Sequence, residues 1–509
     1  MRLILLTSLA STLVSGLLFA APNDPVKLDS GQVSGIPGAA PEMRIYKGIP
    51  FAAPPVGDLR WRAPKPVAHW DGVRAADKFS PICMQNGGGG QKTSEDCLYL
   101  NVWTSAKSGE KRPVMLWIYG GGYNTGSGSQ DMYDGEALAH KGAVVITINY
   151  RLGVFGFFSL PELTREADRR GAGNFGMLDS IAALQWVQKN IAAFGGDPKR
   201  VTIFGESAGA GMVANLMASP LAKGLFHRAI GESSSWTTAQ IGRLETLAEA
   251  EEAGTKFADK LGAKSLAELR AKPAADVLKA GRGQGPIVDG WSIPQDPGLT
   301  FAQGKQIDVP VLVGSNRDES FAQQPATATD FAERIRNRYG SLADTFLKVY
   351  PATSDDQAKD SAFFSGRNEM AWVMRNWARM ESKTGKSKSY VYFFTHQPPV
   401  QPNAKGNFAP TKHGSATHVS EIPYVFETMR PGRAWTDADR QLADEMGSYW
   451  VNFATTGDPN GKGLPKWAPF DDAKNPGALL LDDKIEMGPV LDQSQIALFQ
   501  AYYDGLLEK

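Results

Sequence analysis

The chain has 509 residues, of which 42% are hydrophobic, and its 54 basic residues balance 54 acidic ones. This composition is that of a large folded protein and excludes a disordered chain. Zero net charge and the lack of any run rich in Lys or Arg argue against nucleic acid as a partner.

The chain opens with a short apolar stretch, MRLILLTSLASTLVSGLLFA, over residues 1–20. It begins with one Arg, contains small Ser and Thr residues, and ends in Ala20, which offers a cleavage site. These features predict a secretory signal peptide over residues 1–20, with a retained membrane anchor as the alternative. No later stretch is apolar for long enough to cross a bilayer, so we expect an exported protein with no stable membrane anchor.

The two cysteines, Cys83 and Cys97, enclose thirteen residues that are rich in glycine. A close, isolated pair in an exported protein predicts a disulfide. A zinc site would need more ligands than two cysteines without nearby histidines can supply, so we expect no metal. The sequence also lacks any Asn-x-Ser/Thr acceptor, which favours a bacterial protein of the periplasm or medium over a glycosylated eukaryotic one.

Apolar and aromatic runs that predict buried strands recur along the chain, at 113–119, 143–149, 201–204, 309–313 and 390–394. Helical stretches alternate with them, among them an amphipathic one at 181–194. This alternation predicts an α/β protein with a mostly parallel sheet and helices on both faces. Residues 241–280, rich in Ala, Leu, Glu and Lys, predict surface helices inserted over the sheet. No linker is evident, so residues 21–509 are expected to form a single domain.

Residues 201–212, VTIFGESAGAGM, place Ser207 between a predicted strand and a helix that begins at Ala208. Gly205 and Gly209 complete the pattern G-x-S-x-G, in which a serine on a sharp strand-to-helix turn acts as a nucleophile. Residues without a Cβ relieve the crowding at such a strained turn. The pattern is short, and an ordinary turn that contains a serine is the alternative.

Three glycines, Gly120 to Gly122, directly follow the predicted strand at 113–119. Backbone N–H groups in such a loop can point into a pocket and bind a developing negative oxygen. A flexible turn is the alternative, as we expect for Gly87 to Gly90. The position at the end of a strand favours the oxyanion-binding role.

Three motifs together resemble the type B carboxylesterase family, which includes the cholinesterases: EDCLYLN at 95–101, YGGG at 119–122 and FGESAGA at 204–210. The similarity extends from about residue 27 to about residue 502, through KGIPFA at 47–52, GGDP at 195–198 and FATTGDPN at 453–460. The resemblance implies an α/β-hydrolase fold with helical insertions over the active site. It also implies serine-dependent hydrolysis of small-molecule carboxylic esters through an acyl-enzyme, without a cofactor.

The resemblance further implies a catalytic triad. Ser207 would be the nucleophile, Glu319 in GSNRDES the acid and His418 in HVSEIPYVF the base, in the order that α/β-hydrolases use. Asp318 is the competing acid and is expected to be structural, and His413 is the competing base. The oxyanion would be bound by the N–H groups of three residues, Gly121, Gly122 and Ala208.

The family pattern also implies supporting roles for other residues. Cys83–Cys97 matches the first disulfide of the family, Ser233 matches a serine that supports the acid, and Glu206 is expected to tune the field at the site. Two structural ion pairs are implied as well, Arg60–Glu95 and Arg151–Asp179.

Two alternatives concern function. Adhesion proteins of this family keep the fold but lose the serine, whereas Ser207, Glu319 and His418 are all present here, which predicts an enzyme. The loop between the cysteines lacks the aromatic residue that would receive choline, which argues against a cholinesterase.

The stretch at 280–285 lacks aromatic rings, so we expect acyl groups larger than butyryl to be accepted. Arg282 in that stretch either pairs with a carboxylate on the acyl part or is a solvated loop residue. The natural ester and the oligomeric state stay open.

Overall fold

The computed structural model describes residues 24–107, 109–167, 172–236, 241–400 and 409–508. The expected signal peptide at 1–20 lies outside these residues. Within the described ranges, no helix combines the length and the apolar character needed to cross a membrane.

Eleven of the described strands form one sheet in the order β18-β17-β16-β15-β12-β11-β9-β10-β8-β4-β3. In the part of the sheet that runs across β10, β9, β11, β12, β15, β16 and β17, all neighbouring strands pair in parallel. The strands at both edges of the sheet pair antiparallel. The mostly parallel sheet expected from the alternating elements is therefore confirmed. The bounds are β3 (Ile36–Pro37), β4 (Arg44–Pro50), β8 (Tyr99–Thr104), β9 (Arg112–Ile118), β10 (Val144–Ile148), β11 (Gly196–Glu206), β12 (Arg228–Glu232), β15 (Val311–Asn316), β16 (Ser389–Phe394), β17 (Ala478–Leu481) and β18 (Glu486–Gly488).

The five predicted strand segments correspond to β9, β10, β11, β15 and β16. Their central residues are fully or almost fully buried, as in β10, where all five residues are buried. A parallel sheet covered on both faces excludes water from every side chain, and this explains why these strands read as continuous apolar runs.

Helices cover both faces of the sheet. Gly231 of β12 lies against Trp377 of α12 (Asp355–Thr384), where a Cβ on the glycine would come within 2.4 Å of the indole ring. On β16, Tyr392 packs its ring 5.4 Å from that of Trp450 in α14 (Asp437–Thr456). Gly231 is in register with Val391 through β15, and successive side chains of a strand point to opposite faces. The two helices therefore lie on opposite faces.

The helices differ from the sequence expectation mainly at their starts. Helix α4 (Phe175–Asn190) begins six residues before the predicted stretch at 181–194, and residues 191–194 form a 3-10 turn. Its first turns contain Asp179 and Ser180, which are fully buried. Buried polar residues break the alternation of apolar and polar faces by which an amphipathic helix is predicted. The first turns of α4 were therefore not predicted from the sequence.

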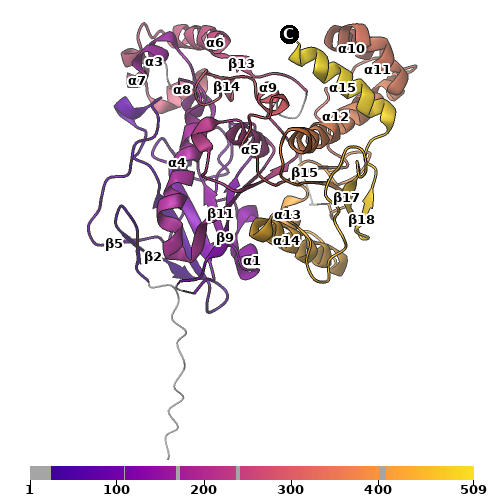
Figure 1. The fold of residues 1–509 in the computed structure, drawn as a ribbon. Coiled ribbons are helices and arrows are strands. Elements are labelled where there is room, and N and C mark those ends of the chain that lie inside the picture. Colours follow the sequence, from indigo (N-terminus) through magenta and orange to yellow (C-terminus); the bar gives the residue numbers. More distant parts are fainter. Residues whose placement is uncertain (1–23, 108, 168–171, 237–240, 401–408, 509) are drawn as a thin grey trace, which may run out of the picture.

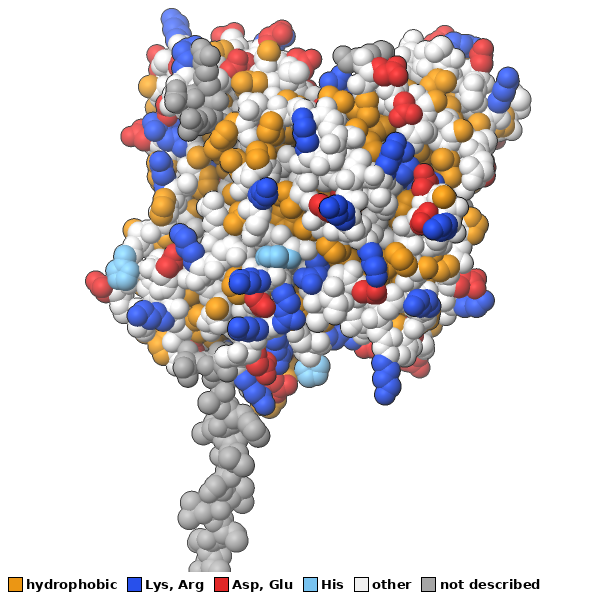
Figure 2. All heavy atoms as spheres, viewed as in Figure 1, with side chains coloured by type: hydrophobic (Ala, Val, Ile, Leu, Met, Phe, Trp, Pro, Cys, Tyr) orange, Lys and Arg blue, Asp and Glu red, His pale blue; other side chains and the backbone are white. Residues whose placement is uncertain are grey.

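Three helices form within the predicted helical stretch at 241–280: α6 (Leu247–Lys260), α7 (Leu266–Ala271) and α8 (Ala274–Ala280). They gather with α3 (Pro161–Glu166) at one end of the molecule, as Figure 1 shows. Arg270 Nη1 of α7 forms an ion pair with Glu166 Oε2 of α3 at 2.6 Å. This end of the molecule is therefore held together by side-chain contacts as well as by the backbone. Basic and acidic side chains are scattered over the face shown in Figure 2.

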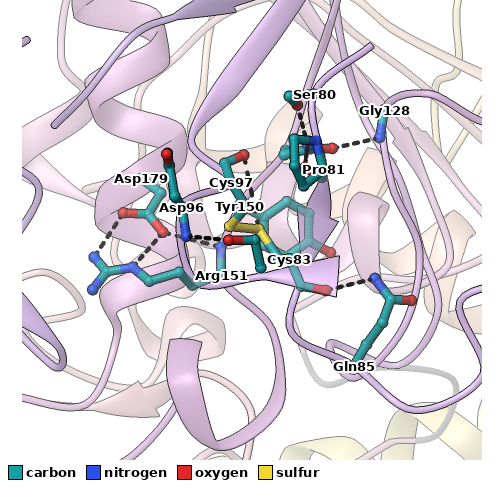
Figure 3. The surroundings of a disulfide bond; sticks show 12 residues. Ser80, Pro81, Cys83, Gln85, Asp96, Cys97, Gly128, Tyr150, Arg151 and Asp179 are labelled. Carbon is teal, nitrogen blue, oxygen red and sulfur yellow. Dashed lines mark hydrogen bonds and ion pairs between the residues drawn. A yellow bond between two sulfur atoms is a disulfide. The ribbon is translucent and has the colours of Figure 1, made fainter. Parts of the chain in front are cut away.

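Cys83 and Cys97 form a disulfide with their Cα atoms 5.0 Å apart. Beside it, the guanidinium of Arg151 donates two hydrogen bonds to Asp179, at 2.8 and 2.7 Å (Figure 3). The other expected ion pair forms in the same two-pronged way, because Arg60 donates to both carboxylate oxygens of Glu95 at 2.6 Å. Such fork geometry makes these pairs more specific than single contacts.

Candidate active site

Ser207 lies on the turn between the last residue of β11 and the first residue of α5 (Ala208–Met217). Its backbone has φ 56° and ψ −128°, a conformation that a residue with a side chain adopts only under strain. The turn therefore lifts the serine out of the strand and holds it at the amino end of a helix, where the helix dipole favours negative charge.

Close packing explains the two glycines of the turn. A Cβ on Gly205 would lie 2.5 Å from the carbonyl oxygen of Ile118, and one on Gly209 would lie 1.9 Å from the same atom. Both distances are far below van der Waals contact. The turn can therefore pack against the end of β9 only if positions 205 and 209 lack side chains.

Glu319 and His418 meet across 99 residues of sequence. His418 Nδ1 lies 2.6 Å from Glu319 Oε2, and both side chains are almost fully buried. Glu319 follows β15, and His418 lies in the loop before the short helix α13 (Ile422–Val425). A carboxylate in this position fixes the ring orientation and favours a proton on Nδ1.

The other carboxylate oxygen of Glu319 is held from two sides. Ser233 Oγ and the backbone N–H of Asn316 both donate to Oε1, each at 2.8 Å. Ser233 directly follows β12 and has a positive φ of 57°. The expected contact of Ser233 with Glu319 is thus present, and with its two oxygens engaged the carboxylate has little freedom to turn.

The second ring nitrogen of His418 faces Glu206. The distance from Nε2 to Glu206 Oε1 is 3.0 Å, and in the described chain the Ser207 hydroxyl makes no hydrogen bond to the ring. Burial alone would lower the pKa of His418, but the charge of Glu206 and the hydrogen bond to Glu319 outweigh it and raise this pKa to about 9. Burial in turn raises the pKa of Glu206 well above its ordinary value. The charge of His418 counteracts that rise in the pKa of Glu206, so the charge on each group favours the charged form of the other.

Two further buried carboxyl groups, which the sequence did not point out as functional, lie near this pair. Burial, followed by the charge of Glu319, raises the pKa of Glu421 to about 7, and Asn316 Nδ2 donates to its carboxyl group. Burial and then the charge of Glu421 raise the pKa of Glu232, which accepts a 2.8 Å hydrogen bond from Trp450 Nε1. The only sequence signals were the position of Glu232 at the end of a strand and the position of Glu421 within the histidine motif.

The predicted oxyanion-binding loop follows β9. Gly121 and Gly122 have φ values of 99° and 61°, and within the described residues their N–H groups donate to no acceptor. Ala208 is the first residue of α5, where backbone N–H groups have no partner inside the helix. Gly120 packs against the serine turn, where a Cβ would lie 2.8 Å from Ser207 Cβ.

Ser207, His418 and the Gly120–Gly122 loop open onto one cavity of about 1070 Å³, which is large enough for a small-molecule substrate. Its walls come mainly from loops at 82–91, 120–133 and 428–435. Phe321 also lines it and packs edge-on against the His418 ring, with centroids 4.6 Å apart. Sequence reasoning did not single out Phe321, because one aromatic residue after the acid carries no distinguishing pattern.

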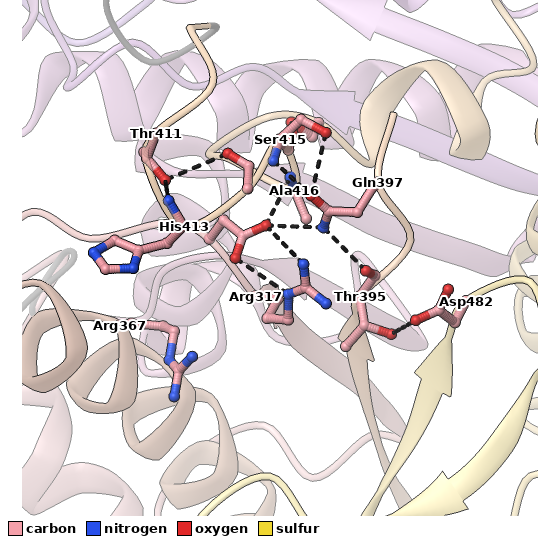
Figure 4. A network of polar contacts seen from close by, with 12 residues as sticks. Arg317, Arg367, Thr395, Gln397, Thr411, His413, Ser415, Ala416 and Asp482 are labelled. Atoms are coloured by element: carbon pink, nitrogen blue, oxygen red, sulfur yellow. Dashed lines mark hydrogen bonds and ion pairs between the residues drawn. The ribbon is translucent and has the colours of Figure 1, made fainter. Parts of the chain in front are cut away.

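Asp318 and His413 lie apart from the contact between Glu319 and His418. Asp318 accepts hydrogen bonds from Arg317, Gln397 and the N–H of Ala416, a network visible in Figure 4. It thereby fastens the loop that carries His418. His413 stacks on Phe363, with ring centroids 4.1 Å apart, and does not line the cavity.

Arg282 does not line the cavity either, and its side chain is exposed. Of the two alternatives for Arg282, the position of the residue favours a solvated loop residue over a contact with an acyl carboxylate. Its loop is directed elsewhere because Gly283 packs against the backbone of Gly153, where a Cβ would come within 2.2 Å.

One group of side chains in the described chain could in principle hold a metal: His396, Asp482 and Asp483, whose ligand atoms lie within 4.8 Å of one another. Both nitrogens of His396 are already engaged, with Asp483 and with Asp439, each at 2.8 Å. Both ring nitrogens of His396 are therefore in contact with carboxylates, and neither is available to bind a metal.

The fold and the site together define a class of protein: an α/β-hydrolase with a serine elbow beside a buried Glu–His pair. The profile of the carboxylesterase family matches residues 22–499, and the chain belongs to this family. It hydrolyses carboxylic esters, with small-molecule esters as substrates.

Relatives support this assignment over most of the chain. A fumonisin B1 esterase from Sphingopyxis macrogoltabida is 38% identical, covering 89% of this chain and 86% of its own length. The para-nitrobenzyl esterase of Bacillus subtilis is 33% identical, with 86% and 91% covered. Among solved structures, a PNB esterase superposes with a TM-score of 0.80 at 31% identity over 93% of this chain and 99% of its own. A carboxylesterase from Geobacillus stearothermophilus gives 0.79 at 32% identity over 94% and 99%.

Proposed function

We propose that Ser207, His418 and Glu319 carry out the ester hydrolysis as nucleophile, base and orienting acid. The observation that supports this most is the 2.6 Å contact between His418 Nδ1 and Glu319 Oε2 beside a serine that opens onto the same cavity as the ring. A serine hydroxyl is a weak nucleophile until a base removes its proton, and the base must be held by a third group.

The reaction would proceed in two halves. Ser207 Oγ bonds to the ester carbonyl carbon while His418 Nε2 accepts its proton, and the bond to the alcohol oxygen then breaks as the ring returns the proton to the leaving alcohol. Water repeats the sequence on the acyl-enzyme and releases the acid. Nε2 must first exchange Glu206, 3.0 Å away, for the serine hydroxyl, and such bonds often align only with substrate bound.

The oxyanion formed in each half of the reaction would accept hydrogen bonds from the backbone N–H groups of Gly121, Gly122 and Ala208. Two features favour this role: the free N–H groups of the glycine loop, and the position of Ala208 at the start of α5. Each such donor contributes roughly 10² to 10³ in rate when it is aimed at the developing charge.

The triad is tested by covalent labelling. An organophosphate should inactivate the protein with one-to-one stoichiometry and add its mass to the peptide that contains Ser207, whereas Ser207→Ala should be neither labelled nor active. His418→Ala should lose acylation, and the matched variant His413→Ala should keep it. Label on another peptide, or turnover by Ser207→Ala, would show that the assignment is wrong.

We further propose that residues 1–20 are a signal peptide and that residues 21–509 are exported as a single catalytic domain to the bacterial periplasm or medium. The Cys83–Cys97 disulfide supports export, because such bonds persist in oxidising compartments. Mass spectrometry of the protein recovered from each cell fraction tests this. Mature chains should begin at Ala21, and a chain retained in the cytoplasm with its first twenty residues would contradict it.

The preferred ester is best sought with a panel that varies the acyl and alcohol parts separately. Fumonisin B1 belongs in that panel because the esterase named for it is 38% identical over 89% of this chain.

A further inference from the structure

His418 lies in a connection that has little regular structure of its own. Within the described residues, the chain between β16 and α13 forms no helix, and its one backbone bridge joins Thr411 and Gly414. A base must nevertheless be held within about 0.5 Å of its working position. The contacts of this loop with neighbouring segments must therefore place the ring.

Asp318 binds both backbone polar groups of Ala416, two residues before His418. The N–H of Asp318 donates to the carbonyl of Ala416 at 2.8 Å, and the N–H of Ala416 donates to Asp318 Oδ2 at 3.1 Å. Both residues are buried. A reciprocal pair of hydrogen bonds fixes the direction of the backbone as well as its position, whereas a single bond would let it turn.

Gln397 and Gly414 bring the rest of the loop against the same carboxylate (Figure 4). Gln397 Nε2 donates to Asp318 Oδ2 at 2.9 Å, and Gln397 Oε1 accepts the N–H of Ser415 at 2.7 Å. Gly414 passes so close that a Cβ on it would lie 2.1 Å from Asp318 Oδ2. The loop is therefore packed directly on this carboxylate, with no room for an added methyl group.

The segment that binds the loop also carries the acid. Asp318 directly precedes Glu319. Two residues before Asp318, Asn316 donates from its backbone N–H to Glu319 Oε1 at 2.8 Å and from Nδ2 to the carbonyl of Thr417 at 2.9 Å. One short segment thus fixes both the carboxylate and the backbone that leads into His418.

We infer that Asp318 is a positioning residue for the reaction, because its hydrogen bonds to Ala416 place His418 where the ring serves both the acid and the serine. The inference rests on the proposed function, since it takes His418 as the base. What matters is the acceptor at Oδ2 and not the negative charge. Asp318 is not among the charges that raise the pKa of His418.

The test breaks the contact from either side. Asp318→Ala deletes the acceptor, and Gly414→Ala inserts a methyl group between the loop and the carboxylate. Both should lower kcat, by about 100-fold for a displacement of about 1 Å. KM should change little, because acylation and deacylation both use His418.

Asp318→Asn is the conservative variant and should keep most of the activity. Its amide oxygen can still accept the N–H of Ala416, and Arg317, whose side chain is 34% exposed, can turn from the amide N–H group toward water. The acid limb of the kcat/KM profile should stay in place in this variant, since only the charge is lost.

A spectroscopic signal and a control separate positioning from stability. The downfield proton resonance of the His418 ring, identified by its loss in His418→Ala, should persist in Asp318→Asn and shift or broaden in Asp318→Ala. Asp296 is also buried and accepts a backbone N–H, from Gly298 at 2.8 Å, but does not line the cavity. Asp296→Ala should therefore lower the free energy of unfolding in urea and leave kcat per folded molecule unchanged.

The two proposals fail in different ways. Acylation of His418→Ala would refute the base assignment, whatever the Asp318 variants do. The positioning inference would be overturned if folded Asp318→Ala kept the wild-type kcat, if Asp318→Asn lost as much activity, or if Asp296→Ala lowered kcat equally. Should Asp318→Ala fail to fold, Gly414→Ala decides: a wild-type kcat overturns the inference, and a lower kcat at similar KM supports it.

Discussion

Replacing Glu206 by Gln should move the acid limb of the kcat/KM profile to lower pH. In the proposed mechanism only neutral His418 can accept the proton of Ser207, and the pKa of His418, about 9, arises partly from the charge of Glu206. The amide keeps the shape of the side chain but removes the charge that stabilises the protonated ring. The pKa of His418 then falls, and the neutral base is present at lower pH.

The size of the shift follows from the 3.0 Å separation of Nε2 and Oε1. Coulomb's law gives about 1.4 kcal/mol at a dielectric constant near 80 and about 5 kcal/mol near 20. One pKa unit corresponds to about 1.4 kcal/mol, so these limits correspond to roughly one to four units. Burial raises the pKa of Glu206 and so opposes its charged form, and we therefore expect a shift toward the lower end of this range.

The assay is the pH dependence of kcat/KM, which reports groups of the free enzyme, with a neutral ester from about pH 5 to pH 10. Glu232→Gln is the matched control: it is another buried carboxyl group of the cluster, but its charge is not among those that raise the pKa of His418. An acid limb that stays in place in Glu206→Gln, or moves to higher pH, would refute the reasoning. Near-ultraviolet circular dichroism of each variant verifies that it is folded.

Three other outcomes are expected. Replacing Cys83 and Cys97 together by Ala should lower the free energy of unfolding in urea by about 3 kcal/mol, because the bridge closes a 14-residue separation, and a loss below about 1 kcal/mol would contradict this. Burial and the neighbouring charge of Asp308 raise the pKa of Glu381 from 4.5 to about 8. Its contribution to stability is therefore present below pH 4.5 and lost as pH rises through 8, by up to about 5 kcal/mol. Unfolding of wild type and Glu381→Gln at about pH 5 and pH 9 should show a steeper fall for wild type, and parallel curves would refute it. Benzoate esters should be turned over at rates comparable with acetate esters of the same alcohol, and a steep preference for acetate would exclude an open acyl pocket.

Much of the fold was predictable because its signals are local. The strands at 113–119 and 143–149 are read from composition, since both faces of a parallel sheet are buried. The start of α4 was missed because its buried Asp179 pairs with Arg151, and no local pattern marks a polar residue as buried. Glu232 and Glu421 were missed as neighbours of the histidine for the same reason.

The sequence by itself determined the strand–serine–helix turn at Ser207, because glycine spacing and apolar runs act over a few residues. The candidates Glu319 and His418 came from the resemblance of their motifs to those of a known family. Only the tertiary structure decided which groups meet. It placed Glu206 on the free nitrogen of His418, stacked His413 on Phe363, and brought Arg433 rather than Arg282 to the cavity. These contacts join residues far apart in the chain, and packing of whole elements, which no short stretch encodes, sets their distances.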